Sequence, residues 1–213
     1  MEKQRVSNYD ITRDRAEEQF LEYDQEKMIA RYGLEHDTSY IYIDFLGHRY
    51  RISRSSGRIE WSSDDFETAV HADFNEALTI FDVLCYAKDD CSLSGEFVQV
   101  NDLEGVAKTA SLGSYMYETR GKLMKNQAEL LKTACEKLGG VPVKMPGDVA
   151  CQIPMFPFLP VILQFWDADE EFDAVLKLMW DKNTLKYMHY ETTYYGAMHL
   201  LKRLSEIMEQ QRK

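Results

Sequence analysis

Residues Val149 to Trp180 read VACQIPMFPFLPVILQFWDADEEFDAVLKLMW, and this stretch decides the fold class. It holds three short apolar runs, at 149–153, 159–166 and 174–180, which turn residues separate. The runs are short for helices and contain many Val, Ile and Phe residues, so they predict β-strands. The acidic connection between the second and third runs, at 167–171, predicts a hairpin or a wider loop.

A second β-rich block lies nearer the N-terminus, at 40–62. Residues 40–45 and 48–52 have the composition of strands, and Leu46-Gly47 joins them as a tight turn. A second turn at 53–57 leads into a third strand at 58–61. This block therefore predicts a small antiparallel meander.

Helical sequence surrounds the two β-rich blocks. The expected segments are a charged N-terminal helix from Thr12 to about Tyr32, the clearest helix from Thr68 to Ala87, a loop over 88–102, weaker helical sequence over 106–117, a helix over 122–138 that Gly139-Gly140 ends, and a last helix capped by Thr192 or Thr193. Neither β block has enough strands to close a core alone. We therefore predict one α+β domain over residues 1–213, in which the early meander 40–62 and the late strands 149–180 form small antiparallel sheets packed against several amphipathic helices.

The composition excludes several classes of protein. The formal charge is −11, with 25 Lys and Arg against 36 Asp and Glu, and the pI is about 5.0. An acidic chain of this kind does not hold nucleic acid across its whole surface, and no apolar run approaches the roughly 20 residues that cross a bilayer. Three windows concentrate the acidity, at 58–76, 88–104 and 164–181. If they converge in space, they form a face that favours cations or a basic partner.

The cysteines and the N-terminal residues indicate the compartment. The polar start, Met1 to Arg5, has no apolar segment of a secretory signal. The four cysteines form no CxxC pair, and Cys85 and Cys135 fall on apolar helix faces, where we expect buried thiols. We predict a cytoplasmic protein with reduced thiols.

The densest candidate for chemistry is the acidic stretch from Trp166 to Asp173. Its clustered carboxylates are the ligand type that Ca²⁺ and Mg²⁺ prefer, but it lacks the glycine of the EF-hand spacing. Asp148 follows Gly147 just before a predicted strand and would complete a carboxylate pair if it lay near Glu170 or Glu171. The candidate binding residues are therefore Asp148, Trp166, Asp169, Glu170 and Glu171. The alternative interpretation is a solvated acidic turn, with Asp148 serving as a turn residue.

Other motifs for chemistry are missing from the sequence. The five histidines are scattered without metal-ligand spacing, and we expect surface or capping roles for them. No nucleophile elbow, P-loop or dinucleotide-binding glycine pattern occurs. The tyrosines at 187, 190, 194 and 195 could stack on a flat ligand or pack internally. We predict no catalytic residue, no metal centre and no cofactor from these patterns.

Six blocks of the second half follow one another in a recognisable order: Leu93 to Val98, Leu138-Gly139-Gly140, Gly147 to Ala150, Phe158-Leu159-Pro160, Trp166 to Phe172 and Leu178 to Asp181. With these blocks the chain resembles the uncharacterised "domain of unknown function 3786" family of anaerobic bacteria and archaea. The resemblance covers roughly Phe74 to Leu204 and places Asp148 and 169–171 among the family's pattern positions. It implies an association with anaerobic one-carbon and corrinoid metabolism but no assigned activity. Some members carry an iron–sulfur module, and this chain lacks the clustered cysteines for one.

We therefore predict a non-enzymatic cytoplasmic binding or accessory domain that acts on a small molecule or a protein partner, without nucleic acid or membrane. The alternative is a cation-dependent enzyme that uses Asp148, Asp169, Glu170 and Glu171. A third hypothesis is a structural module whose exposed aromatic side chains are buried against a partner.

Overall fold

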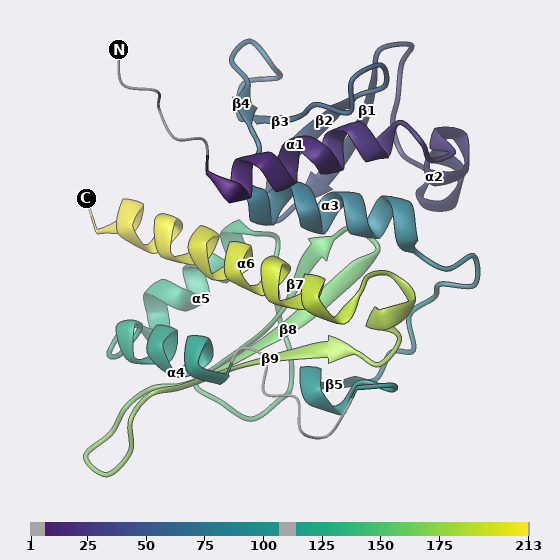
Figure 1. Ribbon diagram of the computed structural model, residues 1–213. Helices are drawn as coiled ribbons and strands as arrows, with labels where there is room; N and C mark the ends of the chain where they lie inside the picture. Colours follow the sequence, from purple (N-terminus) through teal and green to yellow (C-terminus); the bar gives the residue numbers. More distant parts are fainter. Residues whose placement is uncertain (1–6, 107–113, 213) are drawn as a thin grey trace.

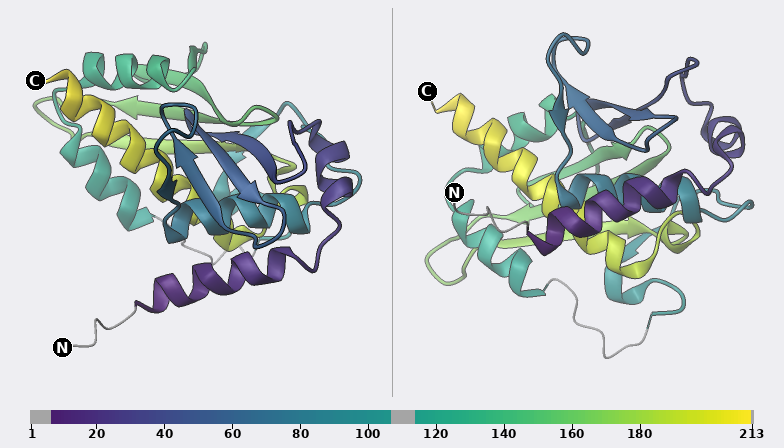
Figure 2. Two further views of the ribbon diagram at one scale, coloured as in Figure 1. Left: turned by 90° about the horizontal axis from the view of Figure 1, so that it is seen from above. Right: turned by 45° about the horizontal axis from the view of Figure 1, so that its top comes forward.

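The computed structural model describes residues 7–106 and 114–212, and in this part of the chain it contains six α-helices and two antiparallel sheets (Figure 1). The α+β class is therefore confirmed. Early and late strands form separate sheets, one of four strands and one of five. Helix α3 lies between the two sheets (Figures 1 and 2).

The late apolar runs form the centre of the five-stranded sheet, as predicted. Its order is β5-β9-β8-β7-β6. The three long strands are β7 (Val149–Phe156), β8 (Leu159–Trp166) and β9 (Val175–Asp181), and the short edge strands are β5 (Phe97–Gln99) and β6 (Val141–Pro142). Residues 161–165 of the central strand β8 are all buried, which explains why its sequence is apolar without alternation. The expected loop at 88–102 is wrong in one part, because β5 pairs with β9 there.

The early meander is confirmed and gains a fourth strand. Its strands are β1 (Tyr40–Phe45), β2 (His48–Ser53), β3 (Ile59–Ser62) and β4 (Val70–His71), paired in that order. The turn between β1 and β2 meets β7, where the Leu46 N–H donates to the Met155 carbonyl at 3.0 Å. Beside this bond, the Phe45 and Phe156 rings stack with their centroids 4.7 Å apart.

The helices pack around α6, which crosses one face of the five-stranded sheet (Figure 1). They are α1 (Asn8–Phe20), α2 (Gln25–Tyr32), α3 (Phe74–Tyr86), α4 (Ser114–Leu123), α5 (Ala128–Lys137) and α6 (Tyr190–Gln211), with 3₁₀ turns at Val100–Asp102 and Thr184–Lys186. A Cβ on Gly196 of α6 would lie 3.1 Å from the Met155 sulfur, so α6 lies close against β7. The buried apolar side chains of both sheets and the helices form one continuous cluster. None of the helices in the described residues is long and apolar enough to cross a membrane.

Two predicted helices have wrong limits, because an aspartate caps a helix at a point that the apolar spacing does not reveal. The N-terminal helix is not continuous, because α1 ends at Phe20 and Asp24 caps α2 by accepting from the Lys27 N–H. The helix predicted from Thr68 begins only at Phe74, since Asp73 caps it and the two residues of β4 precede it.

Two further helix predictions were also wrong. The segment 122–138 is split, because α4 ends at Leu123 and Asn126 takes a left-handed φ of 60° before α5. The C-terminal helix begins at Tyr190 after His189, so Thr192 and Thr193 lie inside it and do not cap it. Part of the expected helical stretch 106–117, residues 107–113, lies outside the described residues.

We predict that Gly57→Ala destabilises the fold far more than Gly33→Ala. Both glycines have left-handed φ values, +72° and +61°, so an alanine strains both by about 1 kcal/mol. A Cβ on Gly57 would also lie only 1.9 Å from the Glu17 carbonyl oxygen of α1, whereas a Cβ on Gly33 meets nothing within 4 Å. Urea unfolding should show a loss of about 3 kcal/mol or more for Gly57→Ala and about 1 kcal/mol for Gly33→Ala. Equal losses would contradict this packing of α1 on the meander.

Candidate functional site

The Asp148 side chain contacts the acidic connection, but its partner there is a backbone N–H group and not another carboxylate. The Asp148 Oδ2 accepts from the Asp167 N–H at 2.7 Å, so the two segments meet. The Asp169 Oδ1 accepts from the N–H groups of Glu171 and Phe172, and these bonds hold the pKa of the Asp169 carboxyl below its usual range. Side chains 169–171 are exposed in the β8–β9 loop, and in the described residues none of them contacts the Asp148 carboxylate.

Trp166, the last residue of β8, directly precedes the acidic connection and lies one position beyond the pair of Phe165 with Val149, next to Asp148. Its indole ring is half-buried, and the Lys177 Nζ lies 5.2 Å from the ring centroid. This contact is a cation–π interaction between neighbouring strands β8 and β9. The predicted residues thus lie at the adjoining ends of β7 and β8 and in the loop that follows, and none of them lines the hollow between the meander and α6 described below.

A second pair of sequence blocks meets at a buried carboxylate. Asp181, at the end of β9, is fully buried and accepts from three backbone N–H groups, those of Ser94, Gly95 and Asn183, at 2.8–3.0 Å. The Ser94-Gly95 block and the Asp181 block therefore form one structural joint. The three backbone donors satisfy the carboxylate in its buried position.

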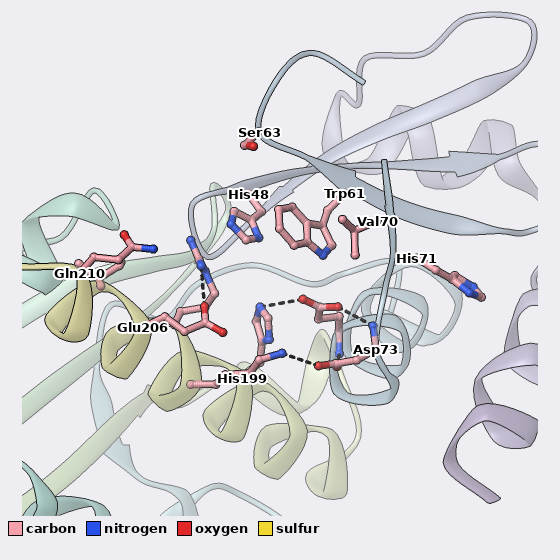
Figure 3. Close-up of a pocket in the computed structure, with 13 residues that line it drawn as sticks. His48, Trp61, Ser63, Val70, His71, Asp73, His199, Glu206 and Gln210 are labelled. Atoms are coloured by element: carbon pink, nitrogen blue, oxygen red, sulfur yellow. Dashed lines mark hydrogen bonds and ion pairs between the residues drawn. The ribbon is translucent and has the colours of Figure 1, made fainter. Parts of the chain in front are cut away.

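A different part of the molecule forms a hollow of about 550 Å³ between the meander, the start of α3 and α6 (Figure 3). It is lined by His48, Trp61, Ser63, Val70, His71, Asp73, Glu76, His199, Lys202, Arg203, Glu206, Ile207 and Gln210. A volume of this size is within the range of small-molecule sites, about 300–1,000 Å³.

The floor of this hollow is a buried polar cluster. Glu76 is 3% exposed and His199 1%. The Tyr50 hydroxyl donates to the Glu76 Oε1 at 3.0 Å, and the His199 Nε2 lies 3.5 Å from the Tyr50 oxygen and 3.6 Å from the Glu76 Oε1. Burial is the main cause of the raised pKa of Glu76, and it raises the pKa of Tyr50 well above 10.

The N-terminal turn of α3 fixes the two carboxylates of the floor. The Asp73 Oδ1 accepts from the Glu76 N–H at 3.1 Å, and the Glu76 Oε2 accepts from the Asp73 N–H at 2.5 Å. This reciprocal pair is a capping box. It uses one oxygen of each carboxylate and leaves the other oxygen toward the hollow, where the Lys202 Nζ lies 2.8 Å from the Asp73 Oδ2.

The charged and aromatic side chains of the walls come from α6 and the meander. Arg203 pairs with Glu206 at 2.8 Å, and the pair follows Lys202 along α6. The His48 ring stacks on Trp61 with centroids 3.9 Å apart and an interplanar angle of 12°. Burial, with Arg203 and Lys202 nearby, lowers the pKa of His48 to about 4, and burial lowers the pKa of His199 to about 3.

Two groups of side chains have an arrangement that could hold a metal ion. In each group the ligand atoms lie within 4.8 Å of one another; one is Asp73, Glu76 and His199, and the other is Asp14, Glu17 and His71. Both lie away from the acidic hairpin. No group that contains Asp148, Asp169, Glu170 or Glu171 meets this geometry among the described residues.

Sequence reasoning missed the floor of the hollow because its members come from three distant segments. Tyr50 is on β2, Glu76 on α3 and His199 on α6. One local signal was available: the spacing of Asp73 and Glu76 is that of a capping box. Nothing local indicated that a histidine from the last helix would be buried beside it.

Comparison with known proteins gives one match. A family model described as "Domain of unknown function (DUF3786)" matches residues 24–203, which includes the meander and thus begins earlier than the resemblance in the sequence. No curated protein and no solved structure matches the chain.

We predict that Asp181→Asn costs about 2–4 kcal/mol of unfolding free energy, because it turns an amide NH₂ toward a backbone donor in a buried site. The matched variant is Asp169→Asn. There one oxygen accepts both N–H bonds, so an exposed asparagine keeps them and should cost less than about 1 kcal/mol. Urea unfolding of both variants tests this difference; equal costs would mean that Asp181 is not the joint described above.

We also predict that stability falls as the pH falls from about 6.5 to about 4, in part through His48. The pKa of this imidazole is about 4 in the fold and 6.5 in the unfolded chain, so the unfolded chain binds a proton in this window that the folded chain does not. The His48→Gln variant should have a shallower slope of unfolding free energy against pH, by up to one proton. Parallel slopes for the two proteins would refute it.

Proposed function

This chain belongs to the DUF3786 family of domains of unknown function, and we propose that it is a non-enzymatic binding domain that holds a small zwitterionic molecule in the hollow between the meander and α6. The observation that carries the proposal is the pair of opposite-charge contacts in that hollow, Lys202 with Asp73 and Arg203 with Glu206, beside the aromatic pair of His48 and Trp61.

The charges of the hollow support a ligand that has both signs. Each cation of the walls already has a carboxylate partner at 2.8 Å. A ligand with a single charge would leave one protein charge without a partner in a half-buried place, which is unfavourable. A zwitterion offers a carboxylate to Lys202 or Arg203 and an ammonium group to Asp73 or Glu206, so every charge keeps a partner.

The aromatic wall supports a ligand that has a flat or apolar part. Trp61 is half-buried, and its indole nitrogen side faces the floor of the hollow (Figure 3). Among the described residues the Trp61 Nε1 donates to no acceptor, so it offers a hydrogen bond to a bound molecule. Val70 and Ile207 add apolar surface to the same lining.

The hydrogen bonds of Asp73 and Glu76 support a binding role and not a catalytic one. All four carboxylate oxygens of Asp73 and Glu76 accept a hydrogen bond within the protein, so the groups are arranged to be held in place. The accessory role in anaerobic one-carbon or corrinoid metabolism comes from the family resemblance and is part of the same proposal. A cytoplasmic location is proposed too, and four cysteines without a disulfide support it.

The acidic connection remains the alternative candidate site. A cation held by Asp148, Asp169, Glu170 and Glu171 would need the exposed hairpin to fold back on Asp148. Side chains 169–171 are exposed, and among the described residues no group that contains these carboxylates has the spacing of metal ligands, which favours the role of turn residues over that of ligands. The hollow therefore has the stronger support.

A thermal-shift experiment with three matched probes tests the zwitterion proposal. L-phenylalanine carries both charges, 3-phenylpropanoate only the carboxylate, and phenethylamine only the ammonium group. We expect phenylalanine to raise the Tm in a concentration-dependent way and the two singly charged analogues, at equal concentration and ionic strength, to raise it clearly less. Equal shifts for all three probes, or no shift with phenylalanine, would sink the proposal.

The variant Lys202→Met should lose most of the phenylalanine shift, because it removes the partner of the ligand carboxylate. Lys182→Met is its control. The two lysine side chains are 47% and 48% exposed, and each pairs with one carboxylate, but Lys182 pairs with Glu96, away from the hollow. A phenylalanine shift that Lys182→Met reduces as much as Lys202→Met would place binding elsewhere.

A further inference from the structure

The buried imidazole of His199 has no normal hydrogen bond. Its Nε2 lies 3.5 Å from the Tyr50 oxygen and 3.6 Å from the Glu76 Oε1, whereas N–H···O bonds are about 2.7–3.2 Å long. Its Nδ1 is buried without a partner. A histidine that is 1% exposed, with one nitrogen unpartnered and the other in only a long contact, needs an explanation.

The separations suit two ligands of one metal ion better than they suit a hydrogen bond. Zinc lies about 2.0–2.2 Å from histidine nitrogens and carboxylate oxygens, so in a tetrahedral site two such ligand atoms are about 3.4 Å apart. The distance between the His199 Nε2 and the Glu76 Oε1 is close to this value at 3.6 Å. The nearest oxygen of Asp73 completes a set within 4.8 Å.

The neighbouring groups orient these ligands as the outer shell of a metal site does. The capping box fixes one oxygen of Asp73 and one of Glu76 through backbone N–H groups, and the Tyr50 hydroxyl donates to the Glu76 Oε1. Hydrogen bonds of this kind, from groups that do not touch the metal, fix the orientation of ligating carboxylates. Of the oxygens outside the capping box, the Glu76 Oε1 lies 3.6 Å from the His199 Nε2, and the Asp73 Oδ2 faces the Lys202 Nζ.

We propose that Asp73, Glu76 and His199 bind one divalent transition-metal ion at the floor of the hollow. One histidine and two carboxylates are a donor set that zinc accepts, and three protein ligands leave a coordination position open to the hollow. The Lys202 ammonium group now occupies the place of a cation beside Asp73, and it is exposed enough to swing out when the metal enters. This inference goes beyond the zwitterion proposal and stands without it.

The second group of possible ligands, Asp14, Glu17 and His71, contains no histidine nitrogen in so long a contact. There the His71 Nε2 lies 2.6 Å from the Glu17 Oε1, which is hydrogen-bond distance, and the Glu17 Oε1 also accepts from the Ile59 N–H. Figure 3 shows His71 pointing away from the floor of the hollow. These groups are satisfied by one another, so His71 serves as the control.

The test uses the full chain after treatment with EDTA, titrated with ZnCl₂ by calorimetry and with MnCl₂ by electron paramagnetic resonance. Manganese is included because it prefers oxygen and nitrogen ligands and so avoids the thiols of Cys85 and Cys91. We expect one ion per chain. His199→Gln and Asp73→Asn should each weaken binding at least tenfold, and His71→Gln and Asp169→Asn should leave it unchanged.

Asp73→Asn guards against a variant that merely fails to fold, because asparagine is as good an N-cap as aspartate. Lys202→Met gives a prediction of opposite sign from the phenylalanine experiment: removal of the competing ammonium group should keep or tighten metal binding. Binding that survives both His199→Gln and Asp73→Asn, or that Lys202→Met abolishes, would overturn the assignment, as would the absence of binding. The phenylalanine titrations are run in EDTA, so either proposal can fail alone.

Discussion

The hydrogen bond from the Leu46 N–H to the Met155 carbonyl joins the two sheets, and the position of the hollow depends on it. Met155 can accept this bond because the pairing of β7 with β8 is irregular there. Pro154 faces Pro160, and neither residue has an N–H group. The register then shifts between Pro154 and Phe156. The free carbonyl then pairs with the turn of the meander instead of with β8. As a result, β2 lies over α3 and α6 with Tyr50 directed at Glu76 and His199.

The strands could be predicted from the sequence because their signal is local. The β8 run 159–166 is apolar except for Gln164, which follows from burial in the centre of a covered sheet, and its observed limits are the predicted ones. Helix ends were predicted less well, because a single carboxylate decides them. Asp24 and Asp73 each begin a helix inside a stretch whose apolar spacing continues across the break.

The candidate site could not be predicted in the same way, because its chemistry arises from contacts between distant segments. The sequence drew attention to crowded carboxylates at 167–173, yet crowding there serves the hairpin, where Asp169 closes a turn. Burial instead raises the pKa of Glu76, which lies outside that crowded stretch. The joint at the end of β9 arises in the same way, because Asp181 and Ser94-Gly95 are far apart in the sequence and meet only in the folded chain.

The capping box places the beginning of a helix and the floor of the hollow in the same two side chains, Asp73 and Glu76. Local unfolding of the first turn of α3 and loss of the floor are therefore one event. By linkage, whatever occupies the floor also protects that turn, and its amide hydrogens exchange with solvent more slowly in proportion to occupancy. The same helix packs against α1 (Figure 2), so α3 carries the floor of the hollow and also holds the N-terminal helix.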